Sequence, residues 1–169
     1  LEEAAEAMAG AQLARRAGDP RLESRCRLGV AKAHYRARRL DSALAASQEA
    51  ARLARAAHDP AGLAATLQWR GYARLTSGDY GGAWHELHEA LAIARETGSL
   101  GSAGLAAMYL ASLALRFGDP ELALEKAALA DSLLIATGNQ RTLGSLHAIR
   151  ADIARVLGDT ALARRMYLS

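Results

Sequence analysis

Apolar residues recur every three or four positions along this chain, in segments of similar length that are separated by short polar turns. This spacing gives each segment one apolar face and predicts a series of amphipathic α-helices. The chain has only three prolines and few β-branched residues, a composition that argues against a β-sheet. We therefore expect an all-α protein.

The predicted turns stand at multiples of about twenty residues. Glycine suits the left-handed position after a helix, aspartate caps the helix that follows, and proline fits its first turn. One turn departs from this chemistry, because Arg38-Arg39-Leu40-Asp41 stands in place of the glycine turn. The other predicted turns are Gly18-Asp19-Pro20, His58-Asp59-Pro60, Gly78-Asp79-Tyr80, Gly98-Ser99, Gly118-Asp119-Pro120, Gly138-Asn139 and Gly158-Asp159.

Alternate segments resemble each other, so the repeating unit is a pair of helices about forty residues long. Full pairs are expected at 21–57, 61–97 and 101–137, with 1–17 as the second helix of a truncated repeat and 141–169 as an incomplete last repeat. An isolated pair cannot bury its apolar face, so the pairs must stack. Neither end shows a polar capping repeat. We therefore expect a piece of a larger protein, with self-association through the uncapped ends as one consequence.

Small residues recur at fixed places in these pairs. They are Ala31, Gly71, Ala111 and Ala151 in the first helices, then Ala43, Ala83, Ala123 and Ala163, and Ala50, Ala90 and Ala130 in the second helices. Together with the Gly78-Asp79-Tyr80 turn, they resemble the tetratricopeptide (TPR) repeat family over nearly the whole chain. The resemblance implies an α-solenoid, a right-handed superhelix of antiparallel helix hairpins.

Two features depart from the usual TPR pattern. The period exceeds the usual thirty-four residues, and similar long repeats occur in bacterial LuxR-type and STAND regulators and in kinesin light chains. Arg70 and Arg150 also stand where the family usually has an apolar residue. The sequence therefore leaves open, by one residue, how the first helix of each pair is rotated about its axis.

Composition narrows the classes of function. The net charge is only +3 despite a pI of 9.4, and the positive charge is nearly all arginine, which indicates a GC-rich genome rather than phosphate binding. The single cysteine, Cys26, excludes an intrachain disulfide and fits a reducing, cytoplasmic compartment. The charge-free stretch between Glu96 and Arg116 is bounded by Gly98 and Gly118, so we interpret it as a buried central helix and not as a membrane span.

Three motifs invite a chemical interpretation. The run Trp84–Glu89 holds two histidines at i and i+3, whereas a zinc protease helix needs i and i+4. A glycine run at Gly98, Gly101 and Gly104 lacks the preceding strand and the following lysine of a phosphate loop. Cys26 has cationic neighbours but no candidate base. We therefore expect no enzyme, no metal and no cofactor.

The first helix of the 21–57 pair carries a basic stripe, which we define as Arg21, Arg25, Lys32 and Arg36. At 100° per residue these four side chains fall on one side of the helix. In TPR-like arrays this side lines the concave groove. The alternative is a solvated basic surface, partly neutralised by acidic residues of the preceding helix.

The resemblance thus implies a partner-binding concave face, basic at one end and apolar and aromatic in the middle. Its candidate residues are Arg25, Leu28, Lys32, Tyr35, Arg36, Gln68, Tyr72, Leu75, Met108, Ser112 and Arg116.

From these features we expect a non-catalytic scaffold segment of a larger cytoplasmic protein, in a bacterial regulatory or signalling context. Its partner is expected to be a protein or peptide, acidic where the basic stripe takes part, and we expect no role at a membrane. Two alternatives stay open. A small-molecule-sensing domain of a transcriptional regulator would show a closed pocket. A nucleic-acid-binding helical repeat would need a continuous basic track, with binding that weakens as salt rises.

Overall fold

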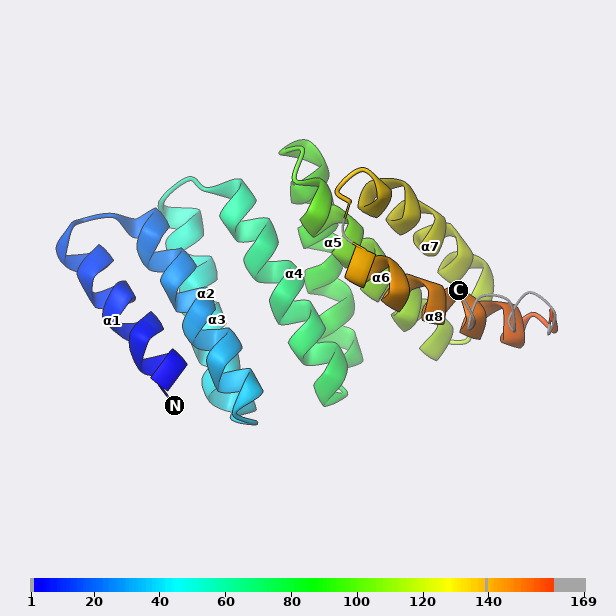
Figure 1. The fold of residues 1–169 in the computed structure, drawn as a ribbon, viewed down its shortest axis with the longest axis horizontal. Helices are drawn as coiled ribbons and strands as arrows, with labels where there is room; N and C mark the ends of the chain where they lie inside the picture. The colour runs from blue at the N-terminus through cyan, green and yellow to red at the C-terminus, as the bar shows by residue number, and fades with distance from the viewer. Residues whose placement is uncertain (1, 139, 160–169) are drawn as a thin grey trace.

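A computed structural model describes residues 2–138 and 140–159 of the chain, and within these residues it contains helices and turns but no strand (Figure 1). The helices are α1 (Glu2–Arg16), α2 (Pro20–Arg36), α3 (Leu40–Ala56), α4 (Pro60–Ser77), α5 (Tyr80–Glu96), α6 (Leu100–Arg116), α7 (Pro120–Ile135) and α8 (Gln140–Val156). The expected all-α fold is confirmed.

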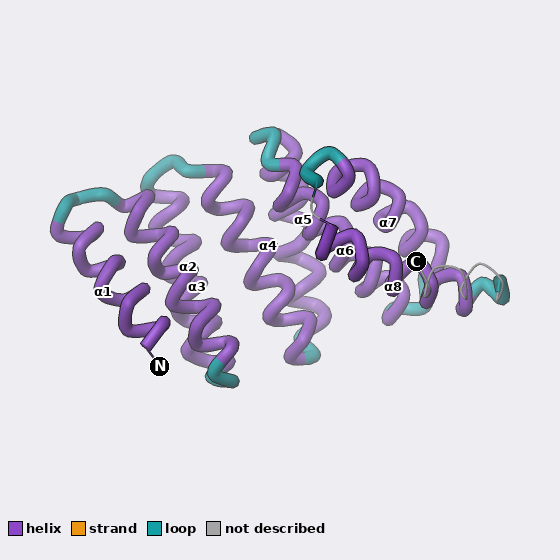
Figure 2. The backbone as a smooth tube through the Cα atoms, in the orientation of Figure 1, coloured by secondary structure: helices purple, strands orange, loops and turns teal. Residues whose placement is uncertain are grey.

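Consecutive helices run antiparallel, and the turns between them alternate between two edges of the array (Figure 2). The most extensive contacts join α2 with α3, α4 with α5, and α6 with α7. Helix α1 packs on α2, and α8 packs on α6 and α7. The chain is therefore an α-solenoid. Asn139 and the last expected helix, from Ala161 and including Ala163, lie outside the described residues.

The array has an inner and an outer layer of helices. Helix α4 contacts both α2 and α6, and α6 also contacts α8. Over the ranges that the structure describes, no contact joins α3 to α5 or α5 to α7. Helices that touch their counterparts in the next repeat must lie on the shorter, inner side of a curved array. The even-numbered helices therefore line the concave face, and α3, α5 and α7 form the outer layer.

The small residues lie where helices cross. Among them Ala31, Ala83, Ala111 and Ala130 have no exposed surface. Gly71 of α4 lies so close to α5 that an added Cβ would come 2.6 Å from the Cγ atom of Leu87. Close approach of helix axes needs small side chains at these positions, because interiors are packed without spare volume.

The turns follow the chemistry expected from the sequence. Four aspartates accept a hydrogen bond from the backbone N–H three residues later, and Gly18, Gly78, Gly98, Gly118, Gly138 and Gly158 all have positive φ. Two non-glycine residues, Arg38 and His58, adopt the same left-handed conformation, with φ of 61° and 48°. The two turns that lack glycine at this position therefore adopt the same backbone conformation as the others. Ser99 starts α6 without a side-chain capping bond.

Asp79 makes the stability of one turn depend on pH. Its carboxylate accepts from the Gly82 N–H at 2.9 Å and pairs with Arg74, and these two contacts, the backbone bond first, hold the pKa of Asp79 below its ordinary value. A depressed pKa adds stability above the unfolded-state value, and this stability is lost as pH falls through the folded-state value, below about pH 4.

Asp79→Asn keeps a capping oxygen but cannot titrate. We expect near-wild-type stability at pH 7 and a smaller loss than wild type on acidification to pH 3, measured by urea unfolding at both pH values. Asp79→Ala, which removes the cap, should cost about 1 kcal/mol at pH 7. Equal acid sensitivity of wild type and Asp79→Asn would contradict this account.

Helix α6 holds the charge-free stretch and is the most buried of the helices in the middle of the array, with nine residues in the interior. None of the helices over the described residues combines the length and apolar character that crossing a bilayer requires.

Candidate functional site

A row of three tyrosines crosses the concave face. We define the tyrosine row as Tyr35 on α2, Tyr72 on α4 and Tyr109 on α6. The Tyr35 and Tyr72 rings are 5.8 Å apart, and the Tyr72 and Tyr109 rings stack at 4.9 Å with 29° between their planes. Trp69 meets Tyr35 edge-on at 5.9 Å. All four side chains are half-buried, so each offers part of its surface to a partner.

The phenols of Tyr72 and Tyr109 stay neutral at physiological pH. Hydrogen bonding with Tyr35, together with burial, raises the pKa of Tyr72. Burial, and then the nearby Tyr72 and Tyr35, raise the pKa of Tyr109 to about 12. The Tyr35 hydroxyl donates to Thr76 Oγ1 at 2.8 Å, which ties α2 to α4. Ring contacts and this hydrogen bond therefore hold the row in a pre-positioned arrangement.

A hollow of about 450 Å³ lies between α2 and α4, and we call it the α2–α4 hollow. It brings together three of the candidate residues, Arg25, Leu28 and Lys32, against the first turns of α4. Its only carboxylate is Asp59, which is engaged with the Gly62 N–H at 3.0 Å. The hollow therefore has an excess of positive charge.

The members of the basic stripe differ in their contacts. Arg36 pairs with Glu3 of α1, and Arg21 reaches the carbonyls of Ala57 and His58 at 3.4 Å. Across the described part of the chain, Arg25 and Lys32 have no hydrogen-bonded or ion-paired partner. Partial burial lowers the pKa of Lys32, and the positive charge of Arg36 lowers it further. Half of the stripe is thus structural, and half is available to an anionic partner.

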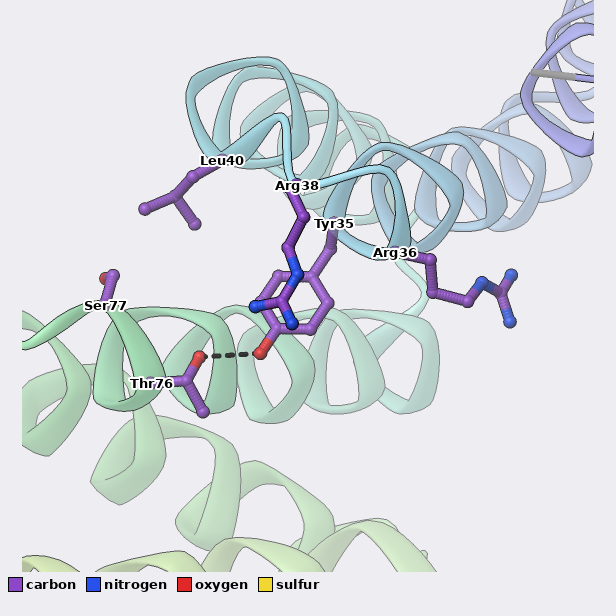
Figure 3. A pocket seen from close by; sticks show the side chains of 6 residues that line it. All are labelled: Tyr35, Arg36, Arg38, Leu40, Thr76 and Ser77. Carbon is purple, nitrogen blue, oxygen red and sulfur yellow. Dashed lines mark hydrogen bonds between the residues drawn. The ribbon is translucent and has the colours of Figure 1, made fainter.

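A second hollow, of about 360 Å³, lies where α2 and α4 end (Figure 3). We call it the turn hollow, and its walls are Tyr35, Arg36, Arg38, Leu40, Thr76 and Ser77. In Figure 3 the Arg38 side chain reaches over Tyr35, whereas Arg36 points away from the hollow. No carboxylate lines this hollow.

The structure places three candidate residues in the interior. Gln68, Leu75 and Met108 are exposed by only 8%, 9% and 3%. The next residue along the chain reaches the concave surface in each case, because Trp69 and Tyr109 join the aromatic contacts and Thr76 lines the turn hollow. The inner helices α4 and α6 are thus rotated by one step from the expected register.

The remaining two candidates lie on α6. Ser112 is half-buried, and Arg116 is exposed. Arg116 turns toward α5, where it donates to the Tyr80 hydroxyl at 3.2 Å and lies 5.3 Å from the centre of that ring. The basic end of the concave face is therefore confined to α2 and its following turn.

Sequence reasoning missed the partners of Arg70. Its Nε atom donates to Glu86 Oε2 at 2.7 Å, and Arg74 Nε lies 3.0 Å from the other carboxylate oxygen. The side chains of Arg70 and Glu86 are exposed by only 13% and 8%. Arg70 thus replaces the usual apolar residue with a buried ion pair between α4 and α5. The only signal in the sequence was that Arg70 departs from the TPR pattern.

The Trp84–Glu89 run is part of the packing. Trp84 meets the Phe117 ring at 5.5 Å and the His88 ring at 4.4 Å, and the Nδ1 atom of His88 lies 3.0 Å from the Trp84 carbonyl oxygen. The described residues contain no group of three or more histidine, cysteine, aspartate or glutamate side chains that could hold a metal ion.

Comparison with known proteins gives one family. The model of the family described as anaphase-promoting complex subunit 5 matches residues 24–72 and 70–151. These matches run from α2 into α8 and include the tyrosine row and both hollows. No curated protein matches the chain.

Proposed function

This chain belongs to the family described as anaphase-promoting complex subunit 5, and from that premise we propose that it is a non-catalytic scaffold within a multiprotein assembly. In this role its concave face binds an extended segment of a partner protein. The family's description names a subunit of a complex, and a solenoid supplies the long concave surface that such a role needs.

The tyrosine row carries this proposal. Aromatic side chains at the centre of an interface usually contribute most of the binding free energy, and tyrosine gives a large contact area at a small entropic cost. The row is held rigid by ring contacts and by the Tyr35–Thr76 hydrogen bond. A partner that covers these rings therefore gains contact area without having to order them first.

A small-molecule sensor is the weaker alternative. The α2–α4 hollow and the turn hollow are both open at the surface, and each lies between repeats on an extended face. A drug-sized ligand usually has most of its surface buried in its pocket. Open hollows along a groove suit an extended chain better than a compact ligand.

We expect Tyr72→Ala to weaken partner binding by about tenfold, which corresponds to about 1.4 kcal/mol, because it opens a gap in the centre of the tyrosine row. Lys32→Ala should weaken binding less at physiological salt, and its effect should shrink as salt rises, since exposed charges are screened beyond about 8 Å at 0.15 M. The measurement is a titration of the native partner, captured by photo-crosslinking from position 76, at two salt concentrations.

Tyr80→Ala is the matched control, because Tyr80 is a half-buried tyrosine outside the row. It should leave partner affinity unchanged. Full affinity in Tyr72→Ala and Lys32→Ala, or an equal loss in Tyr80→Ala, would place the binding site elsewhere.

We also propose that the chain is one segment of a larger protein. The regulatory or signalling context in bacteria, and the placement in the cytoplasm, remain predictions that rest on the long repeat period and on the composition. The domains that flank the segment in its gene would test them, because a neighbouring DNA-binding or ATPase domain would support a regulator.

A further inference from the structure

Arg38 occupies a backbone position that is costly for arginine. Its φ of 61° is left-handed, and the corresponding residues of six other turns are Gly18, Gly78, Gly98, Gly118, Gly138 and Gly158. A side chain with a Cβ atom is strained there. Strained backbone persists where the surroundings fix it, and it is concentrated at functional sites. The strain alone assigns no function to Arg38.

The Arg38 guanidinium has no partner of its own. None of the residues that the structure describes accepts a hydrogen bond from it or pairs with it, whereas its neighbour Arg36 is paired with Glu3. Its side chain reaches into the turn hollow over Tyr35 (Figure 3). The hydroxyl groups of Tyr35 and Ser77 in that hollow already donate hydrogen bonds, to Thr76 and to the Arg74 carbonyl respectively. Arg38 is therefore the main unused donor of the turn hollow.

We propose that Arg38 anchors a carboxylate of the partner segment, and that this segment is acidic. The proposal rests on the proposed function, because it uses the same concave face. A guanidinium presents a planar fork that matches a carboxylate with two parallel hydrogen bonds. Among the residues that the structure describes, no carboxylate lines the turn hollow, so this charge is left for a partner.

The spacing of the free cations defines the segment further. Arg25 precedes Lys32 by seven residues, roughly 10.5 Å along α2 at 1.5 Å per residue, and Lys32 precedes Arg38, in the turn after α2, by six. A polyproline II chain rises about 3.1 Å per residue, and every third residue faces the same way. An extended segment with an acidic residue at every third position can therefore place carboxylates at Arg38, Lys32 and Arg25.

Nucleic acid fits this surface less well. A phosphate backbone needs a continuous track of free cations. Of the arginines that line the two hollows, Arg36 is already paired with Glu3, which leaves Arg25 and Arg38 as separate guanidinium groups. Three spaced cations beside an aromatic row suit a short acidic peptide.

The test uses Arg38→Gly, which removes the guanidinium and also relieves the strained backbone. The probe is a fluorescent peptide with aspartate at every third position and proline or tyrosine between, and its counterpart carries asparagine in place of aspartate. We expect Arg38→Gly to bind the acidic probe about tenfold more weakly than wild type, while its melting temperature rises by a few degrees. A residue that served only stability could not produce these opposite changes.

His58→Gly is the matched control. It relieves the same left-handed strain at another turn, and His58 does not line the turn hollow. It should raise the melting temperature and leave probe affinity at the wild-type value. The anisotropy titration is repeated with Tyr72→Ala and with a single-stranded oligonucleotide of equal charge as competitor.

Each other outcome overturns a defined part of the proposal. Unchanged affinity in Arg38→Gly with weaker binding in Tyr72→Ala would show that Arg38 is not the anchor, while the proposed function would still hold. Unchanged affinity in both variants would contradict both the role of Arg38 and the proposed function. Equal binding of the two probes, or no binding of either, would reject an acidic segment. Displacement of the peptide by oligonucleotide at a concentration below that of the peptide would show that this surface binds nucleic acid in preference to an acidic segment.

Discussion

Glu86→Ala is expected to lower the free energy of unfolding by about 3 kcal/mol. The carboxylate of Glu86 is exposed by only 8% and lies between two arginines of α4, at 2.7 Å from Arg70 Nε and 3.0 Å from Arg74 Nε. Removal of one partner of a buried ion pair leaves an uncompensated charge in the interior. Arg74 retains Asp79 as a partner, so the cost falls chiefly on Arg70.

Glu89→Ala provides the control on the same helix. Glu89 also pairs with an arginine, Arg55, at 2.9 Å, but the two side chains are exposed by 35% and 51%. An exposed pair contributes at most about 1 kcal/mol. Urea unfolding of both variants should therefore give clearly different losses. The double variant Glu86→Met with Arg70→Met should recover most of the stability, since apolar side chains of similar size can replace a buried pair. Equal losses in the two single variants would show that burial of the pair does not matter.

Gly71→Leu is expected to lower the free energy of unfolding by about 2–3 kcal/mol, although leucine favours helices more than glycine does. A Cβ atom at this position would come 2.6 Å from Leu87 Cγ and 2.8 Å from its Cδ2 atom. Leu87 has no exposed surface and cannot turn away without disturbing the core. The larger side chain must therefore push α4 and α5 apart.

Gly144→Leu is the same change at a helical position with open space around it. Nothing lies within 4 Å of a Cβ atom added at Gly144 of α8. Helix propensity alone then determines the change in the free energy of unfolding, and the substitution should stabilise the protein by up to about 1 kcal/mol. Melting curves of the two variants should shift in opposite directions. A Gly71→Leu protein as stable as wild type would contradict the close helix crossing.

The sequence predicts the helices and turns well because their causes are local. Asp59 and Asp119 cap the helices that follow them, and Gly78 and Gly118 take left-handed conformations, as their residue types indicate. The small residues at the helix crossings were also predictable, since repetition at a fixed interval reveals a shared constraint. The turn at Arg38 shows that the stacking of helices can impose this conformation on a residue that disfavours it.

The rotation of the inner helices was not predictable from the same pattern. Met108 and Tyr109 are both largely apolar, so hydrophobic spacing alone cannot decide which one faces the core and which the groove. The structure places Met108 inside and Tyr109 against Tyr72. One signal was present, because Tyr35, Tyr72 and Tyr109 recur at an equal interval that is slightly shorter than the repeat. The ion pair of Arg70 and Glu86 depends on how two helices dock, which no local pattern encodes.

From α1 to α8, the helices that the structure describes, contacts join only neighbours in the chain or inner helices of successive repeats. Such short loops cost little entropy to close, so arrays of this kind fold quickly, within microseconds to milliseconds for helical proteins of low contact order. Synthesis adds about 5–20 residues per second, which is far slower. Each helix pair can therefore dock on the pair before it soon after it leaves the ribosome, before the next repeat has been made. The order of the repeats along the gene is then also the order in which the solenoid is assembled.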